Sequence, residues 1–177
     1  AMVPAILILT FAWSLKAMTD SLGAAEFVAA LTKSSADAFM NLLPAIIFLV
    51  GCGLSFATGT SWGTFGILIP IVVEVFSNSD PNLMIISISA CMAGAVCGDH
   101  CSPISDTTIM ASAGAQCDHV VHVSTQLPYA IVAAAVSFVT YIVAGFVQTA
   151  WIALPFGIIL MLAVILIIRK KHGALEG

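Results

Sequence analysis

Charged side chains are the scarcest feature of this sequence. Lys and Arg together number 5 and Asp and Glu 9, so that charged residues make up 8% of the 177 residues, against about 25% in soluble domains. Hydrophobic residues make up 60%, and the mean hydropathy is +1.12. Such a chain cannot cover itself with polar surface in water, so we expect an integral membrane protein. The few basic side chains also exclude nucleic acid as a partner, because they cannot neutralise a run of phosphates.

The cysteines do not have the pattern of a disulfide framework. Most of the five cysteines lie in apolar stretches, where free cysteine behaves as a small apolar residue. A structural zinc site built from Cys97, His100, Cys101 and either His119 or His122 is the lesser alternative, because this spacing matches no standard zinc motif. We therefore expect no resident metal, no cofactor and no enzymatic activity.

Several apolar stretches approach the length of about 20 residues that a membrane-spanning helix needs. Residues 127–148 and 152–168 form two such spans, with Pro128 in the first turn of the earlier one, and residues 83–115 form a third that is interrupted by polar side chains. At the start of the chain, residues 3–18 resemble a truncated span, and residues 21–36 an amphipathic helix at the membrane interface.

One basic cluster, Arg169 to Lys171, follows the last apolar stretch. The positive-inside rule places this cluster, and with it the C-terminus, in the cytoplasm. We expect a multi-pass protein of the cell (plasma or inner) membrane in which residues 116–126 form a cytoplasmic loop. His119 and His122 would then be solvated loop residues, with pH sensing as the alternative, since histidine titrates near neutrality.

The stretch from 41 to 76 is apolar at both ends and polar in the middle. Each half, 42–57 and 65–76, is too short to cross about 30 Å of hydrocarbon at 1.5 Å per residue. The two readings are a single broken helix and a re-entrant hairpin whose arms meet inside the membrane. We favour the hairpin, because it returns the chain to the side from which it came.

Two polar interruptions, TGTSWGT (58–64) and GDHCSPISDTT (98–108), lie inside apolar sequence. Non-helical backbone is tolerated at membrane depth only when it is buried in protein or lines a watery cavity. Pro103 breaks the helical ladder and should leave the carbonyls near Gly98 and Asp99 free. Carbonyls, hydroxyls and carboxylates are the ligands that a hard cation such as Na⁺ prefers, and paired broken helices are typical of binding sites in secondary transporters.

The two aspartates of the second interruption are the strongest functional signal. A charged Asp at the centre of a bilayer costs about 2.5–3.5 kcal/mol even on lenient scales, so such residues are functional by default. Burial favours the protonated carboxyl, whereas a bound cation favours the carboxylate. We expect Asp106 to bind the ion, with Asp99 as a second ligand or proton partner, although either side chain can instead cap a broken helix. His100 is a candidate proton relay or a hydrogen-bonded residue of the break.

Two segments, ATGTSWGTFGILIPI (57–71) and GDHCSPISDTTIMAS (98–112), resemble the paired signatures of the NhaC family of Na⁺/H⁺ antiporters, and AWSLKAMTDSLGAAEF (12–27) is similar to a third segment of that family. The resemblance implies one half of an inverted-repeat transporter, in which a hairpin tip faces a broken helix. It implies an ion site composed of side chains from both interruptions: Thr58, Thr60, Ser61 and Thr64 from the first, and Asp99, Ser102, Ser105, Asp106 and Thr107 from the second.

The function that this resemblance implies is exchange of Na⁺ (or Li⁺) for H⁺ by alternating access, with both ions as cargo. One alternative is an organic-acid exchanger of the malate/lactate type coupled to Na⁺ or H⁺. The only arginine, Arg169, lies at the expected cytoplasmic end, so no arginine clamps a carboxylate substrate. A non-transporting membrane subunit is a further alternative. The expected partners are the lipid bilayer and an N-terminal repeat that this chain lacks, or a second copy in a homodimer.

Overall fold

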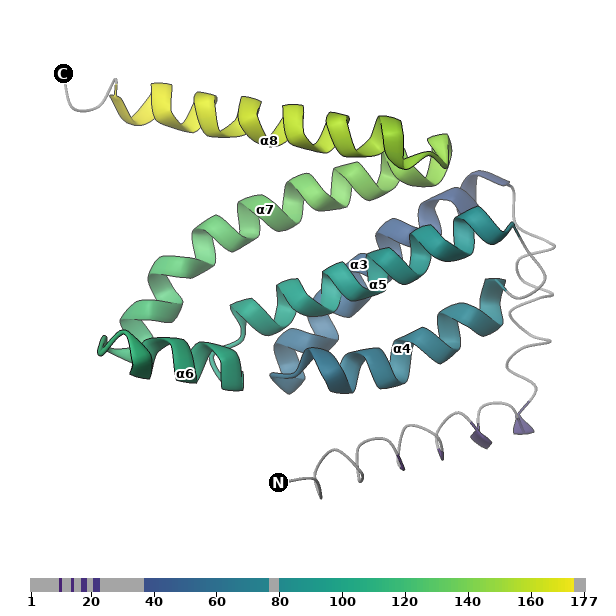
Figure 1. Cartoon of the computed structure of the whole chain (residues 1–177), viewed down its shortest axis with the longest axis horizontal. Helices are drawn as coiled ribbons and strands as arrows, with labels where there is room; N and C mark the ends of the chain where they lie inside the picture. The colour runs from purple at the N-terminus through teal and green to yellow at the C-terminus, as the bar shows by residue number, and fades with distance from the viewer. Residues whose placement is uncertain are drawn as a thin grey trace.

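The computed structural model describes residues 37–76 and 80–173, together with positions 10, 14, 17, 18, 21 and 22. The expected span at 3–18 and the expected interfacial helix at 21–36 lie outside the described residues, apart from those single positions. From residue 37 onward the described chain contains helices and no strand (Figure 1). The helices are α3 (Asp37–Thr58), α4 (Ser61–Phe76), α5 (Pro81–Cys101), α6 (Asp106–Gly114), α7 (His119–Val147) and α8 (Ala150–Gly173).

The prediction of an all-α integral membrane protein is confirmed. Four of the described helices, α3, α5, α7 and α8, are long and apolar enough to cross a membrane, judged by length and composition. Large apolar side chains such as Ile85, Ile131 and Leu154 are exposed on the outside of the bundle. In water such a surface would be costly at about 25 cal/mol per Å², whereas lipid tails accept it.

The first interruption is a helical hairpin with unequal arms. α3 ends at Thr58, and α4 begins at Ser61 and runs back in the opposite direction (Figure 1). The prediction that both arms are too short to cross is wrong for the first arm. α3 contains 22 residues, about 33 Å at 1.5 Å per residue, because the less apolar start of the segment, from Asp37, continues the helix. α4 is the shorter arm, with 16 residues.

The second interruption separates α5 from α6, as expected from Pro103. α5 starts where the carboxylate of Asp80 accepts a hydrogen bond from the N–H of Asn82 at 2.9 Å, with Pro81 in the first turn. This helix has 21 residues and is a candidate span by itself. The break therefore follows a full-length helix, rather than dividing one span over 83–115.

α3 and α5, which run in parallel, form the most extensive helix contact of the bundle, and α4 packs with them around the buried residues Val72, Phe76, Leu83 and Cys91. A Cβ atom added to Gly94 would overlap the backbone carbonyl of Phe48, and one added to Gly98 would overlap that of Cys52. Small residues on α5 thus let the two backbones approach closely, as in other tightly packed membrane helices. This close approach brings the C-terminal end of α3 next to the C-terminal end of α5.

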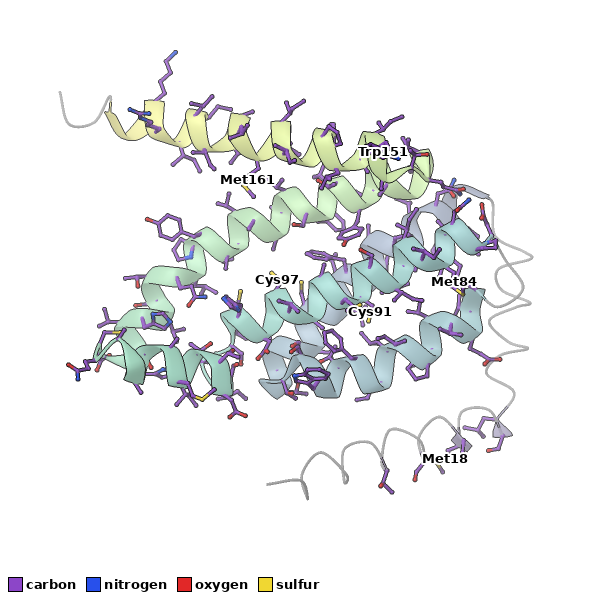
Figure 2. All side chains as sticks on the ribbon, viewed as in Figure 1. Met18, Met84, Cys91, Cys97, Trp151 and Met161 are labelled. Atoms are coloured by element: carbon purple, nitrogen blue, oxygen red, sulfur yellow. The ribbon has the colours of Figure 1, made fainter. Side chains whose placement is uncertain are left out.

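α7 packs antiparallel to α3 and α5, and α8 packs antiparallel to α7. Near the C-terminal end of α7, Gly145 lies against the backbone of Asn41 in α3. One turn earlier in α7, the ring of Tyr141 contacts the ring of Phe48 in the middle of α3, with a centroid separation of 5.4 Å. Met161 lies between α8 and α7 (Figure 2). The predicted cytoplasmic loop at 116–126 is wrong in extent, because α7 already begins at His119.

Two further expectations about the C-terminal helices need correction. α7 has 29 residues and α8 has 24, so that both extend beyond the apolar cores that the sequence predicted at 127–148 and 152–168. Pro128 consequently lies inside α7 instead of in its first turn. α7 is bent in its first half (Figure 1), and a proline inside a helix is an ordinary cause of such a bend.

Candidate functional site

The two polar interruptions lie against each other. Gly59 forms the hairpin turn with φ +68°, and a Cβ atom added there would come within 2.9 Å of the backbone oxygen of Ile104 in the break. Only glycine adopts this left-handed conformation without strain and leaves room for the neighbouring chain. The geometry of the turn thus joins the tip of the α3–α4 hairpin to the segment between α5 and α6.

The break itself is a tight turn over residues 102–105. Pro103 follows Ser102, and the N–H of Ser105 donates to the carbonyl of Ser102 at 3.3 Å, as in a β-turn with proline at its second position. The expected free carbonyl of Asp99 is satisfied, because it accepts the N–H of Ser102 at 3.1 Å. The hydroxyl of Ser102 donates to the carbonyl of Phe56 at 2.8 Å, which ties the break to the C-terminal end of α3.

Asp99 is the carboxylate at the junction. It is 9% exposed, and its two oxygens face the two interruptions. The hydroxyl of Ser61, from α4, donates to Oδ2 at 2.9 Å. The hydroxyl of Ser105, from the break, donates to Oδ1. Both partners are neutral, so a charged Asp99 keeps its full negative charge in a largely buried position.

Two helix N-termini face this carboxylate. Ser61 is the first residue of α4, and Ser105 is the N-cap of α6, where its side chain accepts the N–H of Thr107 at 3.2 Å. The N-terminal end of a helix carries a partial positive charge of about half a unit. Asp99 also lies in the last turn of α5, whose negative end disfavours an anion. The two facing N-termini offset that effect, so the site can hold a carboxylate.

Asp106 lies outside this cluster. It is the first residue of α6, and its side chain is exposed. An acidic residue in the first turn of a helix is stabilised by the positive helix end, which agrees with the capping alternative for Asp106. Of the two aspartates that the sequence singled out, the structure therefore places Asp99, and not Asp106, between the hairpin and the break.

The remaining hydroxyls of the hairpin bond within their own segment. Thr58 donates to the carbonyl of Leu54 at 2.9 Å, and Thr64 donates to the carbonyl of Thr60 at 3.0 Å. The hydroxyl of Thr60 accepts the N–H of Gly63 at 3.4 Å, as an N-cap does. In this structure Ser61 is thus the hairpin side chain that reaches Asp99.

Sequence reasoning missed Ser55, in the last turns of α3. Its hydroxyl is fully buried and has no hydrogen-bond partner among the described residues. Leaving a buried hydroxyl unpaired costs about 1–3 kcal/mol. Ser55 is one residue before Phe56, whose carbonyl accepts the hydroxyl of Ser102. Ser87 shares the property, but it is three turns away from Asp99 on α5.

A cavity of about 180 Å³ with several polar residues in its lining lies on the α7 side of the break. Its lining consists of His100, Thr107, Thr108, Ala111, His122 and Gln126. The carbonyl of His100, at the end of α5, accepts the hydroxyl of Thr108 at 3.4 Å and the side-chain amide of Gln126 at 3.1 Å. Sequence reasoning missed Thr108 and Gln126. Only the fold shows that both lie at the C-terminal end of α5.

His119 does not lie in a solvated loop as expected. It is the first residue of α7, and its Nε2 lies 2.7 Å from the carbonyl of Pro103, while its Nδ1 lies 3.0 Å from the hydroxyl of Ser112. A carbonyl can only accept, so Nε2 carries a proton. His119 thus connects the break and α6 to the start of α7. The described residues contain no group of three His, Cys, Asp or Glu that could hold a metal ion.

The described helices form an apolar bundle in which a helical hairpin meets a proline-broken helix at the buried carboxylate of Asp99. This arrangement is that of a polytopic membrane protein with an internal polar site. This chain belongs to the Na⁺/H⁺ antiporter family, which matches residues 1–146. The members of this family are described as antiporters, which are transport proteins rather than enzymes.

Three relatives illustrate the family. A protein of Haemophilus influenzae described as uncharacterized is 42% identical over 171 residues, covering 97% of this chain and 33% of that protein. The malate-2H⁺/Na⁺-lactate antiporter of Bacillus subtilis is 34% identical over 99 residues, covering 55% and 21%. An uncharacterized Na⁺/H⁺ antiporter of H. influenzae is 42% identical over 92 residues, covering 50% and 19%.

The chain thus spans a third or less of the length of these relatives. No solved structure matches it significantly.

Proposed function

We propose that this chain forms part of an NhaC-type antiporter that exchanges Na⁺ for H⁺, with Asp99 binding either ion in turn. The observation that supports this is a buried carboxylate whose partners among the described residues are the neutral hydroxyls of Ser61 and Ser105. A buried charge that is not paired with an opposite charge is costly even when it is hydrogen-bonded. A proton or a small cation removes that cost, and the two cannot occupy the same carboxylate together.

The oxygen atoms around Asp99 suit Na⁺ in particular. Ser61 donates its proton to Oδ2, which leaves the hydroxyl lone pairs free for a cation. Hydroxyl and carboxylate oxygens are hard ligands and favour hard cations over soft ones. Ser102 holds the break against α3 instead of binding the ion, because its hydroxyl donates to the carbonyl of Phe56.

Alternation between the two sides of the membrane would move the hairpin relative to the break. The contact between Gly59 and Ile104 and the bond from Ser61 to Asp99 join these two elements. A proton on Asp99 weakens the bond from Ser61, because a neutral carboxyl is a poorer acceptor than a carboxylate. Exchanging Na⁺ for H⁺ at Asp99 therefore changes how tightly the two elements are held.

The proposed setting is the cell membrane, with the C-terminus in the cytoplasm. The bilayer covers the exposed apolar faces, and the remaining segments of a longer protein, or a second copy of this chain, complete the site. The basic residues Arg169 and Lys170 at the end of α8 support this orientation.

An organic-acid exchanger is the second candidate, because one relative is a malate-2H⁺/Na⁺-lactate antiporter. Asp99 argues against a carboxylate substrate directly at this position, since like charges repel. A neighbouring subsite from other parts of the protein would have to hold the acid.

The test uses the complete protein reconstituted in vesicles with a pH-sensitive dye inside. An inward Na⁺ gradient alone should move protons outward. Proton movement that requires malate or lactate would favour the second candidate, and no proton movement with any of these solutes would favour a non-transporting subunit.

A further inference from the structure

We propose that protons reach and leave Asp99 through the hydroxyls of Ser105 and Thr107, which connect its Oδ1 to the cavity between α5, α6 and α7. This inference rests on the proposed Na⁺/H⁺ exchange and names the path of one of its two ions. Three observations support it: the direction of the hydrogen bonds at Ser105, the polar side chains among the residues that line the cavity, and the different surroundings of the two oxygens of Asp99.

The hydrogen bonds at Ser105 have a fixed direction. Its Oγ lies next to Asp99 Oδ1, to the hydroxyl of Thr107 at 2.7 Å and to the N–H of Thr107 at 3.2 Å. The N–H can only donate, and a carboxylate can only accept. Ser105 therefore gives its single proton to Asp99, and the hydroxyl of Thr107 must donate to Ser105. The result is a chain of donors that points from Thr107 to the carboxylate.

The cavity lies at the outer end of this chain. Thr107 lines it together with Thr108, Gln126 and the side chains of His100 and His122. Its volume of about 180 Å³ is room for several water molecules, each of which takes about 30 Å³ in the liquid. A water there can donate to the free lone pairs of the Thr107 hydroxyl. The titratable groups that face this water are the two imidazoles.

Proton transfer along this chain is balanced. A hydronium ion in the cavity gives a proton to Thr107 Oγ1, the original proton of Thr107 passes to Ser105 Oγ, and that of Ser105 passes to Asp99 Oδ1. Three O–H bonds form and three break, the hydronium becomes water, and Asp99 becomes neutral. The reverse sequence returns the proton to the cavity when Na⁺ arrives.

The two ions would then approach Asp99 from different sides. Oδ2 faces Ser61 and the hairpin, where free hydroxyl lone pairs are available to Na⁺. The lone pairs of Ser105 are occupied by the hydroxyl and the N–H of Thr107, so Ser105, the hydroxyl next to Oδ1, can pass a proton but has no vacant lone pair for a cation.

The experiment compares Thr107→Val, which keeps the shape of the side chain and removes its hydroxyl, with Thr107→Ser, which keeps the hydroxyl. Thr125→Val is the matched control, because the hydroxyl of Thr125 bonds only to carbonyls of its own helix α7. Each variant of the complete protein is reconstituted and measured in two ways. One is Na⁺-driven proton movement, and the other is exchange of radioactive Na⁺ for Na⁺ at equal pH, which requires no proton.

Thr107→Val should lower Na⁺-driven proton movement about tenfold or more, in line with the loss of a positioned proton-transfer group. It should retain Na⁺/Na⁺ exchange, because the structure places the Thr107 hydroxyl against Ser105 and not, as the resemblance implied, among the oxygens that contact Asp99. Thr107→Ser and Thr125→Val should retain both activities. The inference is overturned if Thr107→Val moves protons at the normal rate, or if it loses both activities together. Failure of the proposed function has a different signature, since the unmodified protein would then show no Na⁺-driven proton movement.

Discussion

The hydroxyl of Ser61 donates a hydrogen bond of 2.9 Å to the carboxylate of Asp99, across 38 positions of the sequence. This bond joins the first residue of α4 to the last turn of α5. It connects the hairpin to the broken helix through a group whose charge depends on what it binds. The strength of the connection therefore depends on the ion at Asp99.

Ser61→Ala should raise the Na⁺ concentration needed for half-maximal transport by about tenfold or more. A hydrogen bond to a charged group contributes about 1.5–3 kcal/mol, and about 1.4 kcal/mol corresponds to a factor of ten. Ser124→Ala is the matched control, because the hydroxyl of Ser124 is exposed and bonds to a carbonyl of its own helix. The measurement is transport rate against Na⁺ concentration in vesicles. An unchanged half-maximal concentration in Ser61→Ala would remove Ser61 from the site.

Gly98→Ala should destabilise the bundle, whereas Gly53→Ala should not. The added Cβ at Gly98 would overlap the carbonyl of Cys52, but at Gly53 it would meet nothing within 4 Å. Overpacking of a tight core costs about 1–3 kcal/mol, while alanine in an exposed helix position gains up to about 1 kcal/mol over glycine. Thermal unfolding in detergent measures the difference. Equal melting temperatures for the two variants would contradict the close approach of α3 and α5.

His119→Phe should loosen α6 and the break. The variant removes the hydrogen bonds to Pro103 and Ser112, each of which contributes about 1 kcal/mol. Because about 1.4 kcal/mol corresponds to a factor of ten, amide hydrogen exchange over residues 106–114 should become roughly 10- to 30-fold faster. His119→Gln keeps a donor that can reach the carbonyl of Pro103 and should recover part of the protection. Identical exchange in all three proteins would show that His119 does not hold this region.

Both interruptions of the apolar sequence could be predicted, because glycine, proline and clustered hydroxyls have strong local effects on a helix. The identity of the buried aspartate was harder to predict. The buried face of α5 repeats at helical spacing through Ser87, Cys91, Gly94 and Gly98, and Asp99 follows directly on this face. The pattern stops at the break, so Asp106 starts a new helix with its own orientation. The small residues along α5 were the sequence signal that could have indicated the buried position of Asp99.

The start of α7 shows why hydropathy alone gave the wrong boundaries. Residues 119–126 are polar enough to be assigned to a loop, yet Asp118 caps a helix there by accepting the N–H of Val121 at 3.0 Å. A hydropathy window detects the part of a helix that lipid can cover, and the helix itself continues for as long as its backbone bonds are made. The contacts of His119 and Gln126 depend on this extra length and could not be derived from composition.

The central claim is that Asp99 is the carboxylate that binds H⁺ and Na⁺ in turn. The direct measurement is Na⁺-driven proton movement in vesicles that contain the complete protein with Asp99→Asn or with Asp106→Asn. Both substitutions remove one negative charge from the same segment, but Asp99 is buried between two helix ends and Asp106 is exposed. We predict that Asp99→Asn abolishes the proton movement and that Asp106→Asn retains most of it. Transport by a folded Asp99→Asn protein, together with its loss in Asp106→Asn, would contradict the account.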